Sequence, residues 1–387
     1  ATTATGIDVT GTATMDGLVV EPSSATGLTY AADGTNSYIN FEANSVSDSV
    51  QLYAGQSSGG YFSIGTKSSG GTLTERFRIA GDGSLSTPTA GTSNVRFGVN
   101  AGNSIVSGGN YNVVVGDEAG TAITTGDYNT AVGMNAAVAL TTGVKNTAIG
   151  STALDAEVAG NYSTAIGMGA LSTQSQSGDV DVYNTAVGYN AGTAVTTGVQ
   201  NTFIGALAGD NLTDADYNTV VGMQALNNDT LGSTSTAIGA FTLNNQNFTS
   251  ATNTYNTAVG YTAGLATTTG VQNTLIGGLA GDAITTGSYN SLVGVNAGGS
   301  LTTGAQNVAV GQGALATNTT GSTNTALGDS SLAANTTASN NTAVGQAALA
   351  TNTTGTENTA TGKGSLQANT TASYNTAVGS GALGDTT

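Results

Sequence analysis

Side chains that commonly catalyse reactions or bind metals are scarce in this chain of 387 residues, which contains no His and no Cys. It therefore lacks the usual general base near neutral pH, the usual thiolate nucleophile, and the imidazole and thiolate ligands of zinc sites. Carboxylates remain, with 23 Asp and Glu residues. A glycoside hydrolase would need a pair of them in a cleft, at strand positions of neighbouring repeats, whereas they fall mostly in turns. We therefore expect no enzymatic activity, no catalytic residue and no cofactor.

Two short acidic segments are the candidates for metal binding. Asp210, Asp214 and Asp216 fall within one turn, and Asp179 and Asp181 fall within another. Oxygen-rich turns hold Ca²⁺ in some proteins. The spacing here matches neither the EF-hand loop nor the Gly-Gly-x-Gly-x-Asp solenoid pattern. We therefore expect solvated surface carboxylates and no metal site.

Charge and hydropathy argue against two further classes of protein. The formal net charge is −17, and the positive residues are few and scattered: Lys67, Arg76, Arg78, Arg96, Lys145 and Lys363. Nucleic-acid binding requires clustered Lys and Arg, so no nucleic-acid partner is expected. No run of 18 apolar residues occurs, so this segment is not expected to span a membrane as a helix.

One phrase, Asn-Thr-Ala-Val-Gly or a close variant, recurs over residues 94–379, and we call its last residue the closing glycine. The closing glycines are Gly98, Gly116, Gly133, Gly150, Gly167, Gly188, Gly205, Gly222, Gly239, Gly260, Gly277, Gly294, Gly311, Gly328, Gly345, Gly362 and Gly379. Their spacings are 18, 17, 17, 17, 21, 17, 17, 17 and 21, followed by 17 seven times. This period is too short for helical or propeller repeats. It suits one coil of a β-solenoid, in which each coil stacks on the previous one.

The phrase predicts a short strand that ends at the closing glycine. Aliphatic residues precede the glycine and are expected to stack from coil to coil as a ladder, with members Val132, Ile149, Ile166, Val187, Ile204, Val221, Ile238, Val259, Ile276 and Val293. Strand alternation places this ladder and Thr on one face, and Asn, Ala and Gly on the other, where small side chains imply tight packing. The Asn that opens the phrase can bond neighbouring backbone and stack as an Asn ladder.

A second short strand is expected after each closing glycine, closed by a Thr-Thr-Gly turn such as 124–126, whose Gly would supply a positive φ. The resulting roll is thin. About three or four buried aliphatic groups per coil, each contributing about 1.5–3 kcal/mol, barely offset about 1–2 kcal/mol of backbone entropy per residue. Packing several rolls side by side would bury a second face, so we expect a symmetric assembly of identical chains.

Two coils contain four extra residues, in the segments 171–181 and 243–250, which begin 72 residues apart. One interpretation is a pair of protruding loops that contact a receptor, because loops on a rigid scaffold commonly carry recognition. The alternative is an ancestral unit duplicated together with its bulge. The candidate receptor-contact residues are Gln174, Ser175, Gln176, Asp179, Asp181, Asn245, Gln246, Asn247 and Phe248.

Tyr precedes the Asn of the phrase in many coils, at Tyr111, Tyr128, Tyr183, Tyr217, Tyr255, Tyr289 and Tyr374. An aromatic row on a rod can stack on sugar rings, and it can equally be wedged between neighbouring coils or chains. Both interpretations stay open at the level of sequence.

The repeat resembles those of two related groups of proteins. The phrase at 129–133, with its Ala and Gly sequel, resembles the head repeats of trimeric autotransporter adhesins, whose usual repeat is shorter than 17 residues. The longer form, with Tyr before the phrase and Asn-Thr-Thr-Gly spacers as at 318–321, is similar to repeats in bacteriophage tail fibres. The resemblance covers about three quarters of the chain. It implies a parallel β-roll in which three chains pack around one axis, and hence a homotrimer.

Residues 1–93 lack the repeat and are predicted to form a separate all-β region for attachment or spacing, followed by a β-roll shaft over 94–387. Short strands are predicted at 6–11, 37–41, 50–53 and 75–79. The last of these, followed by 81–85, is similar to a segment common in phage tail-fibre and tailspike chains.

We therefore expect an all-β fold, a parallel β-solenoid with 17-residue coils. The function that the resemblance implies is a structural fibre and host-attachment component of a bacteriophage tail, located in the virion. Its expected partners are copies of itself, other tail or baseplate proteins, and a host surface glycan or protein. The alternative is a bacterial cell-surface adhesin or extracellular filament of the trimeric autotransporter type.

Overall fold

The computed structural model describes residues 62–67, 73–79, 85–86 and 91–385. Its contacts divide the chain into two units, Ala1–Phe62 and Ser63–Thr387. The strands predicted at 6–11, 37–41 and 50–53 lie outside the described residues. The strands β1 (Phe62–Lys67), β2 (Leu73–Ile79) and β3 (Leu85–Ser86) form a sheet in that order, with β2 and β3 antiparallel. The strand predicted at 75–79 lies within β2.

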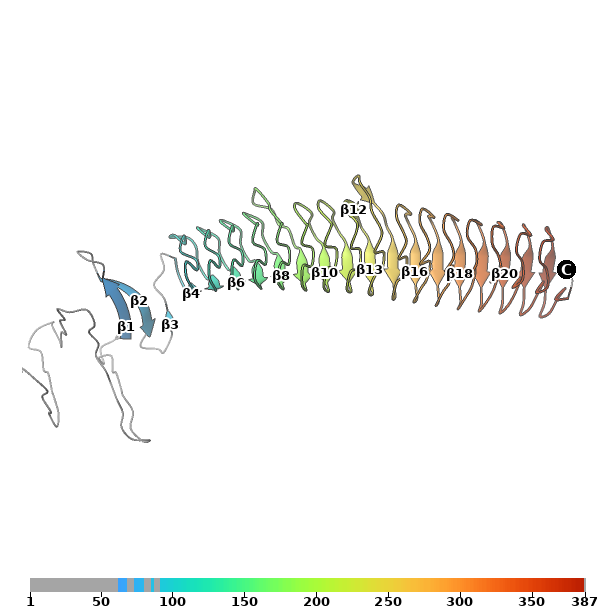
Figure 1. The fold of residues 1–387 in the computed structure, drawn as a ribbon, viewed down its shortest axis with the longest axis horizontal. Helices are drawn as coiled ribbons and strands as arrows, with labels where there is room; N and C mark the ends of the chain where they lie inside the picture. The colour runs from blue at the N-terminus through green and yellow to red at the C-terminus, as the bar shows by residue number, and fades with distance from the viewer. Residues whose placement is uncertain (1–61, 68–72, 80–84, 87–90, 386–387) are drawn as a thin grey trace, which may run out of the picture. The chain divides into compact units, whose positions relative to one another are not determined.

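The repeat region forms a parallel β-solenoid, which confirms the predicted fold class (Figure 1). Its main sheet contains 17 strands, and each is three residues long. They are β4 (Val95–Phe97), β5 (Val113–Val115), β6 (Thr130–Val132), β7 (Thr147–Ile149), β8 (Thr164–Ile166), β9 (Thr185–Val187), β10 (Thr202–Ile204), β11 (Thr219–Val221), β13 (Thr236–Ile238), β15 (Thr257–Val259), β16 (Thr274–Ile276), β17 (Ser291–Val293), β18 (Val308–Val310), β19 (Thr325–Leu327), β20 (Thr342–Val344), β21 (Thr359–Thr361) and β22 (Thr376–Val378).

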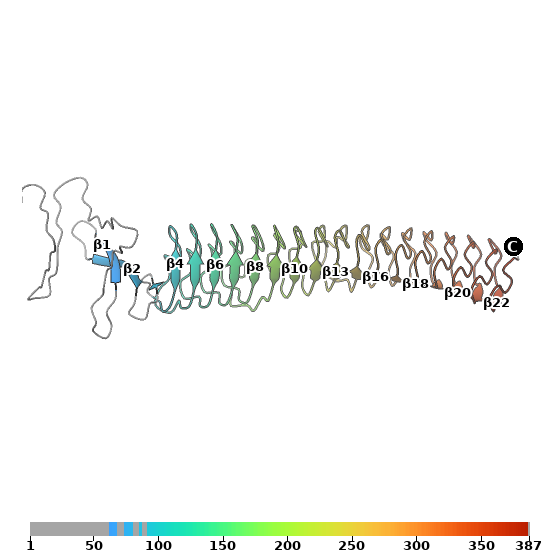
Figure 2. The same cartoon turned by 90° about the horizontal axis from the view of Figure 1, so that it is seen from below.

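Each strand pairs with its equivalent in the next coil, residue for residue, so that Ala131 lies opposite Ala148 and Val132 opposite Ile149. Figure 2 shows these strands side by side along one face of the coil region. The sheet is linear, since among the described strands no pairing joins β22 back to β4. Sixteen steps of about 4.8 Å give a rod of about 75–80 Å. Across the described ranges no helix is long and apolar enough to cross a membrane.

Strand alternation puts the middle residue inside the coil. Ala131 and Ala148 are fully buried, as are Val114 and Phe203 at the same place in other coils. The aliphatic ladder residues stack in register on the opposite, outward face. Ile149, Ile204, Ile238 and Ile276 are exposed there, and Val132, Ile166, Val187, Val221, Val259 and Val293 are half-buried.

The prediction of a second strand after each closing glycine is wrong. The residues there form turns, because left-handed residues interrupt any extended run. In the coil that begins at Gly150, Thr152 has a φ of 55° and Leu154 a φ of 54°. The turns still bond from coil to coil, as where the Leu154 N–H donates to the Ala170 carbonyl oxygen over 3.0 Å.

The closing glycines form a stacked row that excludes any side chain. Gly205 has a φ of +132°, and a Cβ placed on it would lie 2.7 Å from the carbonyl carbon of Gly222 in the next coil. The glycines of the Thr-Thr-Gly turns were predicted to supply a positive φ, and this prediction is wrong for Gly126. Gly126 does not have a positive φ, but a Cβ there would lie 2.5 Å from the Gly143 carbonyl oxygen. Close approach of coils, rather than a left-handed conformation, therefore requires glycine in that turn.

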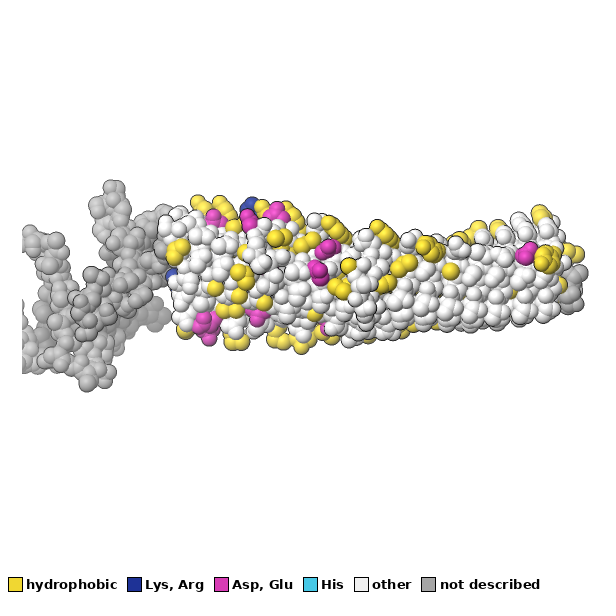
Figure 3. All heavy atoms as spheres, turned by 90° about the horizontal axis from the view of Figure 1, so that it is seen from above, with side chains coloured by type: hydrophobic (Ala, Val, Ile, Leu, Met, Phe, Trp, Pro, Cys, Tyr) yellow, Lys and Arg dark blue, Asp and Glu magenta, His cyan; other side chains and the backbone are white. Residues whose placement is uncertain are grey.

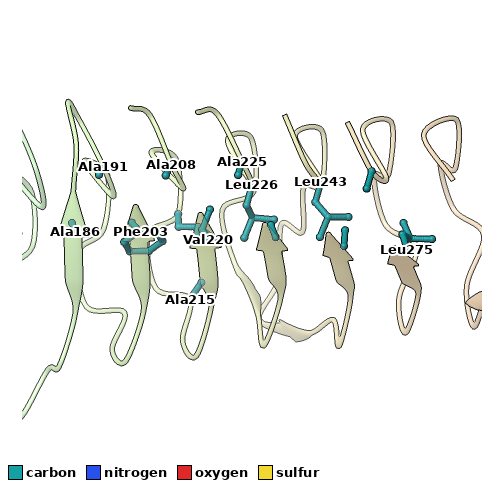
Figure 4. Close-up of a cluster of buried hydrophobic side chains, with 14 of the residues drawn as sticks. Ala186, Ala191, Phe203, Ala208, Ala215, Val220, Ala225, Leu226, Leu243 and Leu275 are labelled. Atoms are coloured by element: carbon teal, nitrogen blue, oxygen red, sulfur yellow. The ribbon is translucent and has the colours of Figure 1, made fainter. Parts of the chain in front are cut away.

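Interior side chains compensate one another in volume, as the buried cluster in Figure 4 illustrates. Phe203, the largest fully buried side chain, lies against Gly192 and Gly209. A Cβ on either glycine would come within 2.7 Å of its ring. Likewise Gly120 leaves room for Ile123, whose Cδ1 lies 2.7 Å from the place of the missing Cβ. The chain therefore keeps one well-filled interior while varying which position is large.

The predicted Asn ladder is confirmed. The Asn129 side chain donates through Nδ2 to the Gly143 carbonyl oxygen over 2.8 Å, and its Oδ1 accepts the Asn146 N–H over 2.9 Å. Asn146 repeats the same two bonds with the carbonyl oxygen of Gly160 and the N–H of Ser163. These amides are buried and hydrogen-bonded, so each links its own coil to the next without leaving a polar group unmet.

Candidate functional site

The two longer coils place their extra residues in segments that stand out on the same side of the coil region (Figure 1). At the second of them, β12 (Gly232–Ser233) of the preceding coil pairs in parallel with β14 (Thr252–Asn253) of the long coil. In the first, a single bridge joins Asn161 to Asp181 at the equivalent place, 72 residues earlier. The two protrusions are therefore built alike on coils that lie four steps apart.

The nine candidate receptor-contact residues separate into two groups. The exposed ones, available to a partner, are Ser175, Asp179, Asp181, Asn245 and Asn247. The buried ones are Gln174, Gln176, Gln246 and Phe248. The structure therefore leaves only the exposed group as a candidate contact surface and gives the buried group an interior role.

That interior role centres on a fully buried carboxylate, Glu157. Its Oε1 accepts backbone N–H groups from Val158, Ala159 and Gly160 over 3.0, 3.1 and 2.7 Å. It also accepts the N–H of Gln176 in the next coil over 3.0 Å. A buried charge is tolerated only when it is well hydrogen-bonded, and these donors come from the coil of Glu157 itself and from the long coil that follows it.

Asp229 repeats this arrangement 72 residues later. It is also fully buried, and its Oδ1 accepts the N–H groups of Thr230, Gly232 and Phe248 over 2.9, 3.2 and 2.9 Å. In each case, a carboxylate in the coil before the long one therefore anchors the backbone at the base of the protruding segment. We call Glu157 and Asp229 the buried carboxylates.

A glutamine completes each network by taking the place of a missing Asn in the ladder. Ser163 stands where the ladder has Asn, and Gln174 donates through Nε2 to the Ser163 Oγ and to the Glu157 Oε2, both over 2.8 Å. The Gln174 Oε1 accepts from Asn184 Nδ2 over 2.9 Å, which restores the connection to the next ladder Asn. Gln246 makes the same bonds with Asp229, Ser235 and Asn256, at 2.6, 2.9 and 2.8 Å.

The buried carboxylates and the inward orientation of the glutamines were not predicted from the sequence. A signal was present in the sequence. In the coil before each insertion, Ser stands in place of the ladder Asn, at Ser163 and at Ser235. An acid stands seven residues after the closing glycine in both of those coils, where Ile123 and Leu140 occupy the same place in ordinary coils. An acid in an otherwise apolar column indicates a buried network rather than surface charge.

A second surface feature is the row of residues just before each ladder Asn, which we call the tyrosine row. Tyr111 and Tyr128 stack with ring centroids 4.9 Å apart, and Tyr162 and Tyr183 stack at 5.0 Å. Lys145 lies between the two pairs, and its Nζ donates to the Tyr162 hydroxyl over 2.8 Å and lies 4.7 Å from that ring's centroid. The tyrosines in the first part of the row therefore stack on one another from coil to coil, while Tyr111, Tyr128 and Tyr183 stay 49–54% exposed.

The C-terminal end of the protruding segment at 171–181 contacts the tyrosine row. The Tyr183 hydroxyl donates to Asp181 Oδ2 over 3.3 Å. Desolvation and the neighbouring Asp181 carboxylate raise the pKa of Tyr183, while the hydrogen bond with Tyr162 raises the pKa of Lys145. Asn161 Nδ2 donates to both Asp179 and Asp181, over 2.6 and 3.2 Å, and so holds the two acids at the surface.

The remaining tyrosines of the row differ. Tyr217, Tyr255 and Tyr289 are 53–57% exposed, and within the described part of the chain they have no ring partner. Gln200, Thr234 and Gln272 occupy the coils between them and Tyr183. Tyr therefore alternates with a shorter polar residue from β9 to β17.

The acidic turn at 210–216 does not gather its carboxylates into one site. Asp210 accepts from Asn227 Nδ2, Asp214 from the Thr197 hydroxyl, and Asp216 Oδ1 from the Val199 N–H over 2.7 Å. Each acid therefore bonds a different neighbour. No group of three or more Asp and Glu that could hold a metal ion occurs in the described ranges.

Exposed apolar side chains follow the outward face of the main sheet. The ladder residues before the closing glycines contribute one line, whose exposed members include Ile149, Ile204, Ile238 and Ile276. The residues just after the closing glycines contribute a second, with Met134, Met168, Tyr189, Met223 and Tyr261 between 47% and 61% exposed. Figure 3 shows another face, on which hydrophobic side chains form broken lines among uncharged polar surface and acids gather over the first half of the coils.

Comparison with models of protein families, with curated proteins and with solved structures finds no match to this chain.

Proposed function

We propose that this chain is a structural fibre and host-attachment component of a bacteriophage tail. The observation that carries the proposal is the in-register stack of 17 coils, which makes a rod of about 75–80 Å. Protruding segments stand on one side of that rod, and a row of exposed tyrosines runs along it. A rigid scaffold that presents loops at fixed spacing suits recognition of an extended surface.

The mechanism is mechanical and needs no catalysis. Backbone hydrogen bonds and the Asn ladder join every coil to its neighbours, so bending the rod would break several bonds at once. The net charge of −17 favours solubility and discourages non-specific association of the rods. Such a shaft would hold its recognition surface away from the particle and transmit the position of the host cell to the tail or baseplate proteins.

We propose that the fibre is a homotrimer packed through the outward apolar face. Ile149 and Ile204 are 38% and 40% exposed, and Met134 and Met168 are 54% and 52% exposed. Exposed apolar side chains that recur along one face of a rod are candidates for burial between chains. Sedimentation equilibrium tests the assembly, with an expected mass of three times the chain mass of 37.6 kDa. A monomeric mass at micromolar concentration would refute it.

The alternative is a bacterial cell-surface adhesin, favoured by the likeness of the phrase at 129–133 to autotransporter head repeats. Immunogold electron microscopy with an antibody raised against residues 94–379 distinguishes the two roles. Label on the tails of phage particles supports the proposal. Label on the surface of uninfected bacteria, with none on particles, would replace it with the adhesin.

A further inference from the structure

The alternating part of the tyrosine row is fixed in position by its backbone. Gln200, Tyr217, Thr234, Tyr255 and Tyr289 all have φ between 52° and 63°. Their N–H groups donate to the preceding coil, as from Tyr217 to the Val199 carbonyl oxygen over 3.2 Å and from Tyr289 to the Val271 carbonyl oxygen over 3.0 Å. A left-handed residue pinned in this way directs its side chain along the same line in every coil.

Ring spacing in the row follows the coil rise. Tyrosines in consecutive coils stack with centroids 4.9–5.0 Å apart, as in the pairs at 111 and 128 and at 162 and 183. Two coils therefore separate ring positions by about 10 Å, twice the strand spacing. The residue between two such tyrosines is shorter than a tyrosine, and a ring placed over it, midway along the gap, would lie at stacking distance from both.

We propose that Tyr183, Tyr217, Tyr255 and Tyr289 frame three slots that bind sugar rings of a neutral host polysaccharide. A pyranose ring presents an apolar C–H face that can stack on a tyrosine and an edge of hydroxyl groups. Gln200, Thr234 and Gln272 form the floors of the slots. The two glutamine amides both donate and accept hydrogen bonds. The Thr234 hydroxyl already donates to the Ser233 carbonyl oxygen, so it offers a ligand only an acceptor. The inference rests on the proposed host-attachment function and names its ligand class.

Charge selects a neutral glycan over an anionic one. The net charge of −17 and the Asp181 and Asp216 carboxylates, next to the first and second tyrosines, repel acidic sugars. In the described part of the row Lys145 is the one cation, and it already lies over the Tyr162 ring, outside the slots. Slots that repeat every two coils match a repeating polymer, since several weak contacts along one chain add to a strong attachment.

Tyrosine fluorescence provides the assay, because the chain contains 14 Tyr and no Trp. The probes are dextran, mannan and galactan as neutral polysaccharides, alginate as an anionic one, polylysine as a basic polypeptide, and polysaccharide extracted from a bacterial strain to which the chain adsorbs. The wild-type chain is expected to give a saturable signal with a neutral probe or the extract. The double variant Tyr217→Ala and Tyr255→Ala should bind about tenfold more weakly.

A slot-filling variant separates binding from folding. Gln200→Tyr with Gln272→Tyr places a ring in two of the gaps, at positions where other coils already accept Tyr, and should abolish binding there without lowering the unfolding temperature. Tyr374→Ala is the matched control, because Tyr374 belongs to the same row, is 75% exposed and follows Glu357 rather than a slot.

The outcomes separate the slot inference from the proposed function. Adsorption of the wild type to bacteria that is lost in the slot-filled variant supports both. Equal adsorption of the wild type and the slot-filled variant overturns the slots and leaves host attachment standing. A chain that adsorbs to no bacterial strain contradicts host attachment, and one that binds no neutral probe or extract, or binds only alginate or polylysine, overturns the slots.

Discussion

Replacing the buried carboxylate Glu157 by Leu tests how the long coils are held. Leu is the residue at the same place in an ordinary coil, as at Leu140. Within the described residues, the Glu157 Oε1 is the one acceptor for the N–H groups of Val158, Gly160 and Gln176. The substitution leaves these three donors without a hydrogen-bond acceptor. It also removes the hydrogen bond that the Gln174 amide donates to Glu157.

The expected loss follows from these bonds. Each buried donor without a partner costs about 1–3 kcal/mol, and burial of the leucine side chain returns about 2 kcal/mol. The three unpaired backbone donors should therefore make the Glu157→Leu variant about 1–7 kcal/mol less stable. Glu157→Gln keeps the shape but sets an amide group against the Gln174 amide, and should lose about 1–3 kcal/mol because it gives up charge-assisted bonds.

Hydrogen exchange with urea unfolding measures the effect. A solenoid is held mainly by neighbouring coils, so the damage should be local and should appear as faster exchange at Gly160 and Gln176 before global unfolding. Asp329→Asn is the control, because it removes the same charge from an exposed side chain. Unchanged exchange at those two amides, with a loss below about 0.5 kcal/mol, would refute the reasoning.

Three further predictions concern the interior, the glycine row and pH. Phe203→Ala should lower the free energy of unfolding by about 3–5 kcal/mol, because the flanking glycines cannot fill the space that the ring leaves. Calorimetry of the variant should show a lower unfolding temperature, and an unchanged one would contradict the prediction. Gly222→Ala should cost about 3 kcal/mol or more and lower the yield of folded chain, since its Cβ would lie 2.4 Å from the Gly239 carbonyl oxygen at a φ of +137°; circular dichroism and urea titration like those of the wild type would count against it. Burial raises the pKa of Asp155 and Asp282, so the folded state binds more protons than the unfolded state, and the stability that these groups contribute is present below pH 3.8 and lost as the pH rises through the folded pKa. Asn at both positions should raise stability at neutral pH and flatten the profile over that window, whereas urea midpoints that run parallel to those of the wild type between pH 3 and 7 would refute the assignment.

The period of the sequence was enough to predict the coil. Aligning the closing glycines predicts which residues pair across strands, and the observed pairing of Thr130 with Thr147 follows that alignment. Small residues at one strand face and Asn at the start of the phrase also predicted the packed interior and the Asn ladder. These features repeat in nearly every coil, so each coil independently supports the same prediction.

The turns after the closing glycines could not be predicted, because they place residues in backbone conformations that those residue types disfavour. Leu154 and its equivalents take a left-handed conformation that Leu rarely adopts, so their aliphatic pattern was interpreted as a second strand. The inward turn of Gln174 and Gln246 was also hidden, because polar residues in an insertion are usually solvated. Their burial depends on the acids at Glu157 and Asp229, 17 residues earlier in each case, and such a pairing becomes visible only when coils are stacked.

Saturable adsorption of the purified chain to intact bacteria tests the central claim most directly. We predict that fluorescently labelled chain binds cells of at least one strain with a defined number of sites, and that stripping surface polysaccharide from those cells removes the binding. The absence of saturable adsorption to every bacterial strain tested, with the coil region shown to be folded by circular dichroism, would contradict the claim that this solenoid is a host-attachment fibre.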